Sequence, residues 1–308
     1  MRVLITGATG FVGQSLAHAL QSHGHDVVRA TRQPQPNSVL VTSIDANTDW
    51  RNALRGCDAV VHLAARVHQM RDASEDPLAD FRRVNTQGTI RLAQQAHTAG
   101  VRRFLFLSSI KVNGEEGVRP YRAVDPPHPQ DAYGMSKWEA EQGLRQLAAQ
   151  TNMETVIIRP PLVYGPGAKA NFHNMMRWLH RGVPLPLASV TDNRRSLVAL
   201  DNLVDLLITC LDHPAAANQT FLASDGEDLS TADLLRRLGR AMGHPARLFH
   251  VPTALLQTGA RLLGKVHMAQ RLLGSLQVDI DHTRRTLGWT PLISVDEGLR
   301  RAAQGFQP

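Results

Sequence analysis

The first half of the chain alternates short apolar runs with longer segments in which apolar residues recur at helical spacing. The apolar runs have the length of buried strands and lie at residues 2–6, 26–30, 39–44, 59–63, 104–107 and 155–159. The longer segments lie at residues 11–22, 78–99 and 131–149. Strands that alternate with helices predict an α/β fold, a Rossmann-type doubly wound parallel sheet with helices on both faces.

After about residue 165 this alternation ends, and proline and glycine become frequent. Shorter segments with helical spacing follow at residues 172–181, 201–212 and 231–242. We therefore expect a nucleotide-binding Rossmann domain at residues 1–165 and a smaller, mostly helical substrate domain at residues 166–308. The boundary is soft, and we expect the chain to cross between the two lobes.

The composition is that of an ordinary soluble protein, with 43% hydrophobic and 20% charged residues among 308. No apolar run reaches the ~18 residues of a membrane span, and the first strand follows Met1 too closely for a signal peptide. The two cysteines, Cys57 and Cys210, fit no metal or redox spacing. We therefore expect a cytoplasmic protein without a metal site.

The chain is basic, with a net charge of +7 and an isoelectric point of about 10.1. Its arginines are scattered, and the sequence contains no basic block with interleaved aromatic residues. We therefore expect no nucleic-acid binding. A solvated arginine-rich surface, or a substrate that carries phosphates, accounts for the charge.

Three glycines follow the first predicted strand and open the first predicted helix. Gly7, Gly10 and Gly13 stand in the string GATGFVG, with G-x-x-G-x-x-G spacing rather than G-x-G-x-x-G. Glycine here permits a tight turn, lets the backbone approach a pyrophosphate, and lets helix and strand pack closely. The helix N-terminus adds unpaired N–H groups. The string predicts a dinucleotide site, and glycines of an ordinary turn are the alternative.

The end of the second predicted strand bears on the choice between NAD and NADP. A carboxylate there would accept hydrogen bonds from the ribose hydroxyls, but this chain has Thr31 and Arg32. A guanidinium group can pair with a 2′-phosphate, so we expect NADP(H) in preference to NAD(H). An exposed Arg32 with NAD bound is the alternative. Asp45 follows the third predicted strand and is a candidate contact for the adenine, or else an ordinary turn or cap aspartate.

A tyrosine and a lysine lie four residues apart in the string YGMSK, on one face of a predicted helix. The phenol of Tyr133 has an ordinary pKa near ~10, which the ammonium group of Lys137 and an oxidised nicotinamide would lower. Ser109 ends the preceding strand, at the edge of the sheet where ligands bind. The alternatives are that Tyr133 and Lys137 are an ordinary side-chain pair on a helix and that Ser109 belongs to an ordinary turn. Together these residues predict hydride transfer on an alcohol or ketone.

The order of these strings resembles the extended short-chain dehydrogenases/reductases of the nucleotide-sugar epimerase/dehydratase type. The resemblance covers nearly the whole chain and rests on GATGFVG, VVHLAA, VNTQGT, LSSIKVNG, YGMSK, RPPLVYGPG, RRSLVALDNLVD and LGWTPLISVDEGL. It implies Tyr133, Lys137 and Ser109 as the catalytic set, NAD(P) as cofactor and a UDP-sugar as substrate. It also implies a homodimer in which the helices at residues 78–99 and 131–149 form a four-helix bundle with their mates.

The resemblance extends to further binding residues. For the cofactor it implies Phe11, Val12, Ala46, Leu63, Ala64, Ala65, Asn85, Ser108, Tyr133, Lys137, Pro160 and Val163. For the substrate it implies Ser109, Lys111, Tyr133, Asn171, Arg195 and Arg271. The two arginines would meet the diphosphate, since a guanidinium group binds phosphate oxygens bidentately. Ordinary surface charges are the alternative for both.

Departures from the family's patterns narrow the reaction. Ile110 and Lys111 stand where 4,6-dehydratases carry an Asp-Glu pair, and Ile110 also stands where 3,5-epimerising members use a cysteine. We favour reduction at C4 of a UDP-linked 4-keto-6-deoxy-N-acetylhexosamine, for O-antigen synthesis. The alternative is 4-epimerisation of UDP-glucose or UDP-N-acetylglucosamine with retained NAD. A non-catalytic NADP-binding sensor is a third possibility, which the intact catalytic set disfavours.

Residues 251–278 are rich in leucine with interspersed basic residues. Such a segment can form an amphipathic helix at a membrane surface. We favour instead a lid or a pair of core helices over the substrate.

Overall fold

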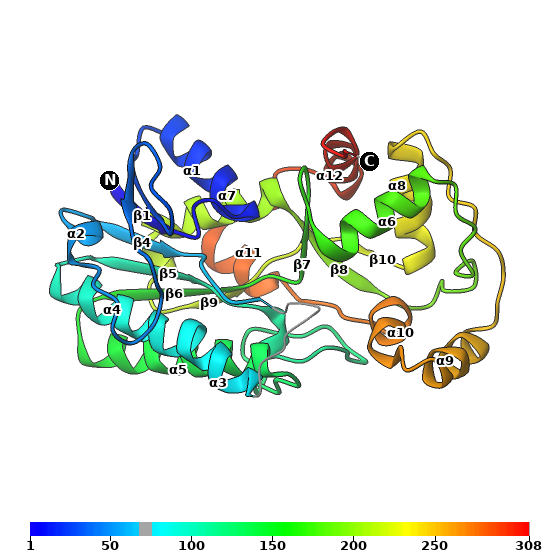
Figure 1. Ribbon diagram of the computed structural model, residues 1–308, viewed down its shortest axis with the longest axis horizontal. Helices are drawn as coiled ribbons and strands as arrows, with labels where there is room; N and C mark the ends of the chain where they lie inside the picture. Colours follow the sequence, from blue (N-terminus) through cyan, green and yellow to red (C-terminus); the bar gives the residue numbers. More distant parts are fainter. Residues whose placement is uncertain (68–75, 308) are drawn as a thin grey trace.

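The central sheet in the computed structural model, which describes residues 1–67 and 76–307, is parallel throughout and matches the predicted fold class (Figure 1). Its strands are, in spatial order, β3 (Ser38–Leu40), β2 (Asp26–Thr31), β1 (Arg2–Thr6), β4 (Ala59–His62), β5 (Arg103–Leu107), β6 (Glu154–Arg159) and β9 (Thr220–Leu222). Every residue of β4 and four of the five residues of β1 and of β5 are buried. This is the pattern of a sheet that helices cover on both faces.

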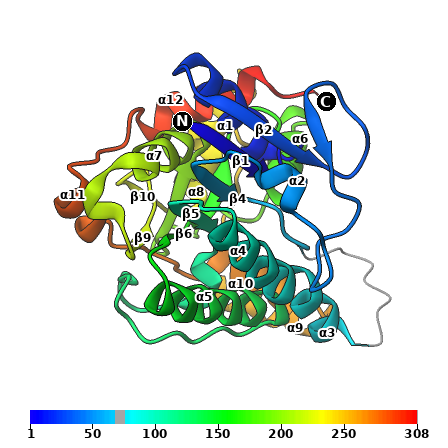
Figure 2. The ribbon, with the colours of Figure 1, turned by 90° about the vertical axis from the view of Figure 1, so that its left-hand side faces the viewer.

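Two layers of helices sandwich the sheet (Figure 2). The helices are α1 (Phe11–Ser22) and α7 (Leu200–Asp212) on one face, and α2 (Arg51–Leu54), α4 (Gly88–Thr98) and α5 (Ala132–Gln150) on the other. Successive residues of a strand point to opposite faces. Accordingly Val3 and Ile5 pack with α1 and α7, whereas Leu4 packs with α4 and α5. The continuous apolar run of β1 is therefore needed to fill both layers.

The predicted helix at residues 78–99 is interrupted. It consists of α3 (Pro77–Phe81), a π-helical turn η1 (Arg82–Gln87) and α4. The side chain of Asn85, within this wide turn, donates to the hydroxyl of Ser136 on α5 at 3.0 Å. The hydroxyl of Thr86 donates to the backbone carbonyl of Ser136 at 2.9 Å. The prediction of one regular helix was therefore wrong. The helical repeat changes locally where this segment contacts α5.

Two strands depart from the sequence prediction. β3 ends at Leu40 rather than near residue 44. Further along, the chain turns at Asp45, whose N–H donates to the hydroxyl of Thr48 at 2.9 Å. β9 comes from the second half of the chain and pairs in parallel with β6, with Ile157 level with Thr220. The chain therefore leaves the sheet after β6 and returns to it with α7 and β9.

The second lobe contains a small sheet that the sequence analysis did not predict. Its strands, in spatial order, are β10 (Asp228–Leu229), β8 (Arg195–Ala199) and β7 (Leu162–Tyr164). The helices α6 (Ala170–His180), α8 (Thr231–Ala241) and α12 (Val295–Gln304) share an apolar cluster with it. The predicted helices at residues 172–181, 201–212 and 231–242 correspond to α6, α7 and α8 within two residues. β10 and β7, with two and three residues, are too short for an alternating pattern to be recognised.

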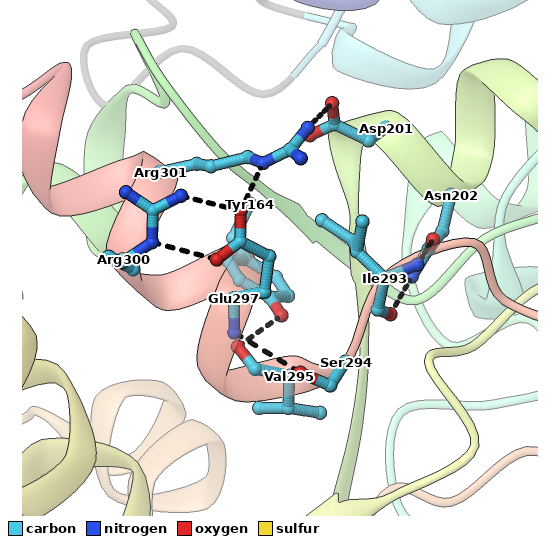
Figure 3. A network of polar contacts seen from close by, with 9 residues as sticks. All are labelled: Tyr164, Asp201, Asn202, Ile293, Ser294, Val295, Glu297, Arg300 and Arg301. Atoms are coloured by element: carbon cyan, nitrogen blue, oxygen red, sulfur yellow. Dashed lines mark hydrogen bonds and ion pairs between the residues drawn. The ribbon is translucent and has the colours of Figure 1, made fainter.

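Polar contacts fasten the C-terminal helix α12 to both lobes (Figure 3). Arg301 pairs with Asp201 of α7 at 2.6 Å. Asn202 exchanges two hydrogen bonds with the backbone of Ile293, at 3.0 and 2.9 Å. The phenol of Tyr164 in β7 lies 3.3 Å from the first backbone carbonyl of α12. The end of the chain therefore helps to hold the small sheet against the helix that covers the large one.

Three further helices, α9 (Thr253–Leu262), α10 (Val266–Leu273) and α11 (Asp281–Leu287), complete the second half of the chain. α9 and α10 lie at the end of the molecule opposite α2 (Figure 1). No residue of α9 is buried, so the expectation of core helices was wrong for α9. Among the described residues, no helix combines the length and the hydropathy that crossing a bilayer requires.

A substitution at Gly13 tests how closely α1 packs on the turn after β1. A Cβ atom at Gly13 would lie 2.1 Å from the carbonyl oxygen of Gly7, so the backbone has to move. We expect Gly13→Ala to lower the free energy of unfolding by about 3 kcal/mol, measured by urea denaturation. Gly259→Ala in α9 is the control, because its Cβ meets no atom within 4 Å. We expect it to be neutral or to stabilise by up to ~1 kcal/mol. Equal losses in both variants would contradict this packing.

Candidate active site

The candidate residues gather at one edge of the large sheet. Thr6, the last residue of β1, is level with Ala30 of β2 and with His62 of β4. Leu107, the last residue of β5, is level with Ile158 of β6. The loops that follow these strands therefore lie side by side at their carboxyl ends, where open α/β sheets bind their ligands.

The turn after β1 suits a dinucleotide. Gly7 has a φ of +68°, and a Cβ atom there would lie 2.8 Å from the amide nitrogen of Ala64. Gly10 precedes α1 without a side-chain cap. The first N–H groups of the helix, on Phe11 and Val12, therefore face outward without a capping side chain. A turn this tight, beside a helix end without a cap, fits the pyrophosphate of NAD(P).

The end of β2 presents a cation rather than a carboxylate. Thr31 is buried, and its hydroxyl lies 2.8 Å from the carbonyl oxygen of Gln33. Arg32 is exposed and makes no side-chain hydrogen bond or ion pair within the described part of the chain. Asp45 accepts a hydrogen bond from the N–H of Asn47 at 2.8 Å, which lowers the pKa of Asp45. Asp45 is thus an ionised turn aspartate with exposed Ala46 beside it, and their contact with the cofactor stays a prediction.

The three predicted catalytic residues come together between β5 and α5. The carboxylate of Asp131 caps α5 by accepting from the N–H of Gly134 at 2.7 Å, which fixes where the helix begins. Tyr133 lies in its first turn, and the Ser109 hydroxyl is near enough to its phenol to lower the pKa of Tyr133. The ammonium nitrogen of Lys137 lies 6.0 Å from the centre of the Tyr133 ring.

Lys137 is almost completely buried, with 1% of its surface exposed. Its ammonium group donates to the carbonyl of Leu107 at 2.8 Å and lies 4.4 Å from the centre of the Phe106 ring. Burial lowers the pKa of Lys137 to about 7, although the carboxylate of Glu141 raises it. The charge on this lysine is therefore sensitive to pH near neutrality.

The pKa of Tyr133 departs from the sequence expectation. Burial and, to a smaller extent, the negative charge of Asp131 raise it to about 12, although the nearby Ser109 hydroxyl lowers it. We had expected Lys137 to lower this pKa, but the cost of desolvating a phenolate dominates. Tyr133 is therefore a proton donor at neutral pH, and it needs additional positive charge nearby before it can act as a base.

A buried carboxylate that the sequence analysis missed supports Lys137. Glu141, one helical turn further along α5, has no exposed surface. Arg159 donates to both of its oxygens, at 2.9 and 2.6 Å, and the hydroxyl of Ser108 donates at 2.6 Å. Arg159 also donates to Asn113 at 2.9 Å. The i,i+4 spacing of Lys137 and Glu141 was a usable signal for this pairing.

A second buried chain of hydrogen bonds joins the glycine turn to η1. The N–H of Ala64 donates to the hydroxyl of Thr6 at 3.2 Å, and that hydroxyl lies 2.6 Å from Nδ1 of His62. On the other side, Nε2 of His62 lies 2.9 Å from the hydroxyl of Thr89, which donates to the carbonyl of Asn85 at 2.6 Å. Each group is satisfied only if His62 is neutral and protonated on Nε2. Burial and the charge of Lys137 accordingly lower the pKa of His62 to about 3.

Lys111, a predicted substrate residue, lies at the rim of this site. Its ammonium group lies 2.5 Å from a carboxylate oxygen of Asp131 and 2.9 Å from one of Glu115. Burial raises the pKa of Asp131, but hydrogen bonds from Lys111 and Gly134 outweigh it, so the pKa is lowered overall. Two carboxylates therefore compete with any substrate group for Lys111.

The two predicted arginines lie near each other in the second lobe. A guanidinium nitrogen of Arg195 donates to the carbonyl of Gly274 at 3.0 Å. Burial lowers the pKa of Arg195, and the positive charge of Arg271 lowers it further. Asn171 belongs to α6, but its side chain lies outside the described residues. Two adjacent cationic groups are what a diphosphate requires.

An extended segment, residues 275–279, links these arginines to the catalytic loop. The N–H of Ser196 in β8 donates to the carbonyl of Leu276 at 2.8 Å. Tyr121, beyond the predicted catalytic residue Ser109, exchanges backbone hydrogen bonds with Gln277 and Asp279, both at 2.8 Å. The segment therefore bridges the loop after β5 and the small sheet, which brings the two parts of the site together.

The remaining predicted cofactor residues also lie at the carboxyl edge. Leu63, Ala64 and Ala65 follow β4, and the carbonyl of Pro160, after β6, accepts from the N–H of Ile110 at 3.0 Å. Val163 lies in β7. Their contacts with a dinucleotide, like those of Asn85 and Ser108, stay predictions.

A tight glycine turn at the carboxyl edge of the sheet, beside a tyrosine and a buried lysine, defines an NAD(P)-dependent enzyme of the short-chain dehydrogenase/reductase class. Residues 3–223 match the family model described as "NAD dependent epimerase/dehydratase family". The chain belongs to this family.

Relatives and solved structures agree with the assignment. A UDP-glucose 4-epimerase of Vibrio cholerae is 47% identical, over 99% of this chain and 95% of its own. An N-acetyl-α-D-glucosaminyl-diphospho-ditrans,octacis-undecaprenol 4-epimerase of Escherichia coli O157:H7 is 27% identical, over 98% of this chain and 94% of its own. The structure of UDP-N-acetylglucosamine 4-epimerase from Bacillus cereus, 18% identical, shares the fold over the full length of both chains with a TM-score of 0.82.

The hydrogen bonds of His62 predict how stability depends on pH. Its pKa is about 3 in the fold, against an ordinary value of 6.5, so below pH ~6.5 the unfolded chain binds a proton that the folded chain excludes. Stability is therefore lost as pH falls. We expect a loss of about 2–3 kcal/mol from this residue between pH ~7.5 and pH ~4.5, measured by urea unfolding.

His62→Gln should flatten this pH dependence, whatever it does to stability at neutral pH, because the titrating group is gone. His250→Gln is the control, since His250 is exposed, and its pH profile should follow that of the unmodified protein. A wild-type slope in His62→Gln would show that His62 does not titrate on unfolding.

Proposed function

We propose that this enzyme interconverts the C4 epimers of a UDP-linked hexose and retains NAD through the catalytic cycle. The observation that carries the proposal is the full-length, 47% identical relative named UDP-glucose 4-epimerase, taken together with the complete Tyr133, Lys137 and Ser109 set. This is the alternative that the sequence left open. The comparisons support it better than the 4-keto reduction that we had favoured.

NAD(H) is the cofactor we propose. The description of the family names NAD, and one protein of the same fold, with a TM-score of 0.78 and 22% identity, was solved "in complex with UDP-glucose and NAD". The tight turn at Gly7 and the close packing at Gly13 suit either dinucleotide. Exposed Arg32 is the one observation that favours NADP(H), and it keeps 4-keto reduction as the second candidate function.

Proton transfer in this proposal belongs to Tyr133. When bound, the nicotinamide supplies the acceptor and then the donor of the hydride. Tyr133 takes the proton of the C4 hydroxyl as the sugar is oxidised and returns it to the 4-keto oxygen after the sugar has turned over. Ser109, whose hydroxyl lowers the pKa of Tyr133, holds the same sugar oxygen. Protonated Lys137 opposes the rise of the Tyr133 pKa that burial causes.

The diphosphate of the substrate is assigned to the second lobe. Arg195 and Arg271 supply adjacent guanidinium groups, and residues 275–279 connect them with the loop that carries Ser109 and Lys111. We propose UDP as the carrier, in line with the Vibrio relative. A role in O-antigen precursor synthesis and a homodimer through α4 and α5 remain predictions.

Epimerisation is tested with purified enzyme and UDP-glucose or UDP-N-acetylglucosamine, without added cofactor. We expect the C4 epimer to form, because retained NAD is regenerated in each cycle. A UDP-linked 4-keto-6-deoxy-N-acetylhexosamine with NADPH or NADH is assayed in parallel. Stoichiometric oxidation of NADPH, without epimer formation from the two hexoses, would show that the enzyme is a reductase.

Tyr133→Phe should lower turnover by about 10²–10⁴-fold, because the general acid/base is removed. Binding of NAD, followed by fluorescence or by the NAD content of purified protein, should be kept. Tyr164→Phe is the control, since its phenol hydrogen-bonds Asp225 in the second lobe at 2.7 Å. It should affect stability more than turnover. Unchanged turnover in Tyr133→Phe would remove this residue from the mechanism.

A further inference from the structure

Helices α9 and α10, with the turn between them, carry an exposed apolar surface that the proposed function does not use. The surface consists of Leu255, Arg261, Leu262, Leu263 and Lys265, and we refer to it as the α9–α10 face. The three leucines are 62%, 83% and 72% exposed. Leu255 and Leu262 are two helical turns apart and therefore share one side of α9. Figure 1 shows these helices at one extremity of the molecule.

The opposite side of the same helices is anchored to the second lobe. Leu256 and Leu273 are partly buried against the apolar cluster of that lobe. The carbonyl of Leu272 accepts hydrogen bonds from Thr231 at 2.6 Å and from Asn193 at 3.3 Å. The inward positions are thus already occupied by other apolar residues. The exposure of the α9–α10 face is therefore a property of the folded chain.

The charge along this part of the chain is of one sign. No aspartate or glutamate stands between Asp233 and Asp279, a stretch that holds seven lysines and arginines. Within the described residues, Arg261 and Lys265 make no side-chain hydrogen bond or ion pair. By contrast, α12 pairs its neighbouring arginines with the carboxylate of Glu297. The α9–α10 face therefore combines exposed leucines with uncompensated positive charge.

We propose that the α9–α10 face docks on the surface of an anionic lipid bilayer. The leucines would enter the boundary between headgroups and acyl chains, and Arg261 and Lys265 would meet the anionic headgroups. A second copy of this chain is a poor occupant, because two such faces would bring unpaired positive charges together. A nucleic acid would satisfy the charges but would not bury the leucines favourably.

Docking would orient the enzyme on the membrane. α10 leads directly into Gly274, whose carbonyl holds the guanidinium group of Arg195. The end of the molecule that carries the proposed diphosphate contacts would therefore lie next to the bilayer. The docking itself does not depend on which sugar nucleotide the enzyme uses, or on whether it is an epimerase.

The experiment is co-sedimentation of the full chain with vesicles. One set contains phosphatidylcholine and phosphatidylglycerol in equal amounts, and the other contains phosphatidylcholine alone. We expect the protein to sediment with the anionic vesicles and to stay in solution with the neutral ones. Added salt should release it, because the electrostatic part of the attraction is screened. Failure to sediment with the anionic vesicles at low salt would overturn the proposal.

Two double variants separate the charge from the leucines. Arg261→Glu with Lys265→Glu should weaken partitioning by about 30-fold or more. Leu255→Gln with Leu262→Gln should weaken it by about tenfold or more. The control is Leu292→Gln with Arg285→Glu, at exposed positions outside this face, which should bind as the unmodified protein does. Equal losses in the control would show that the α9–α10 face is not the docking surface.

Two further measurements exclude trivial causes. Thermal unfolding and turnover of a soluble UDP-sugar should be unchanged in both double variants, because none of the four residues belongs to the core or to the proposed active site. Size-exclusion chromatography completes the test. If the leucine variant dissociates an oligomer while neither protein binds vesicles, the face joins copies of this chain and the membrane proposal is wrong.

Discussion

The burial of one ammonium group, that of Lys137, is the constraint on which the rest of the site depends. Removing a charge from water is costly unless other groups replace its hydration. The carbonyl of Leu107 and the face of Phe106 replace part of it, and Glu141 supplies an opposite charge. Glu141 is in turn neutralised by buried Arg159. Each of these buried charged groups depends on the others, and the contacts that hold α5 also fix β5 and β6 relative to it.

The neutral state of His62 follows from the same constraint. A second buried cation near Lys137 would raise the cost further, and the hydroxyls of Thr6 and Thr89 accommodate the uncharged ring. The chain of hydrogen bonds continues through Asn85 to Ser136 on α5. The dinucleotide turn and the catalytic helix, far apart in sequence, are therefore parts of one buried polar system. Such a system is stable only when every member has a partner.

Local patterns predicted the parts of this protein that local physics decides. The glycine spacing predicted the turn at Gly7 and the close packing at Gly13, and the limits of α1 and β1 were predicted to the residue. The sequence pattern failed to predict the features that depend on tertiary contacts. It missed the π-helical turn around Asn85 and the small sheet. It did not include the effect of burial, which raises the pKa of Tyr133. The preference for reduction rested on the resemblance to a reductase-like branch of the family and on the Thr31–Arg32 pair, and the comparisons favour epimerisation.

The sequence by itself determined the parallel sheet, the catalytic Tyr133–Lys137 spacing and the family, because these depend on residues that are close along the chain. Only the tertiary structure decided that Arg159 of β6 pairs with Glu141, the carboxylate one helical turn from the buried lysine, since no periodic pattern in the sequence marks a pairing between two elements. It also decided that residues 275–279 bring Arg195 to the loop after β5. That bridge consists of backbone hydrogen bonds, which any residue except proline can make. No pattern of side chains could therefore predict it.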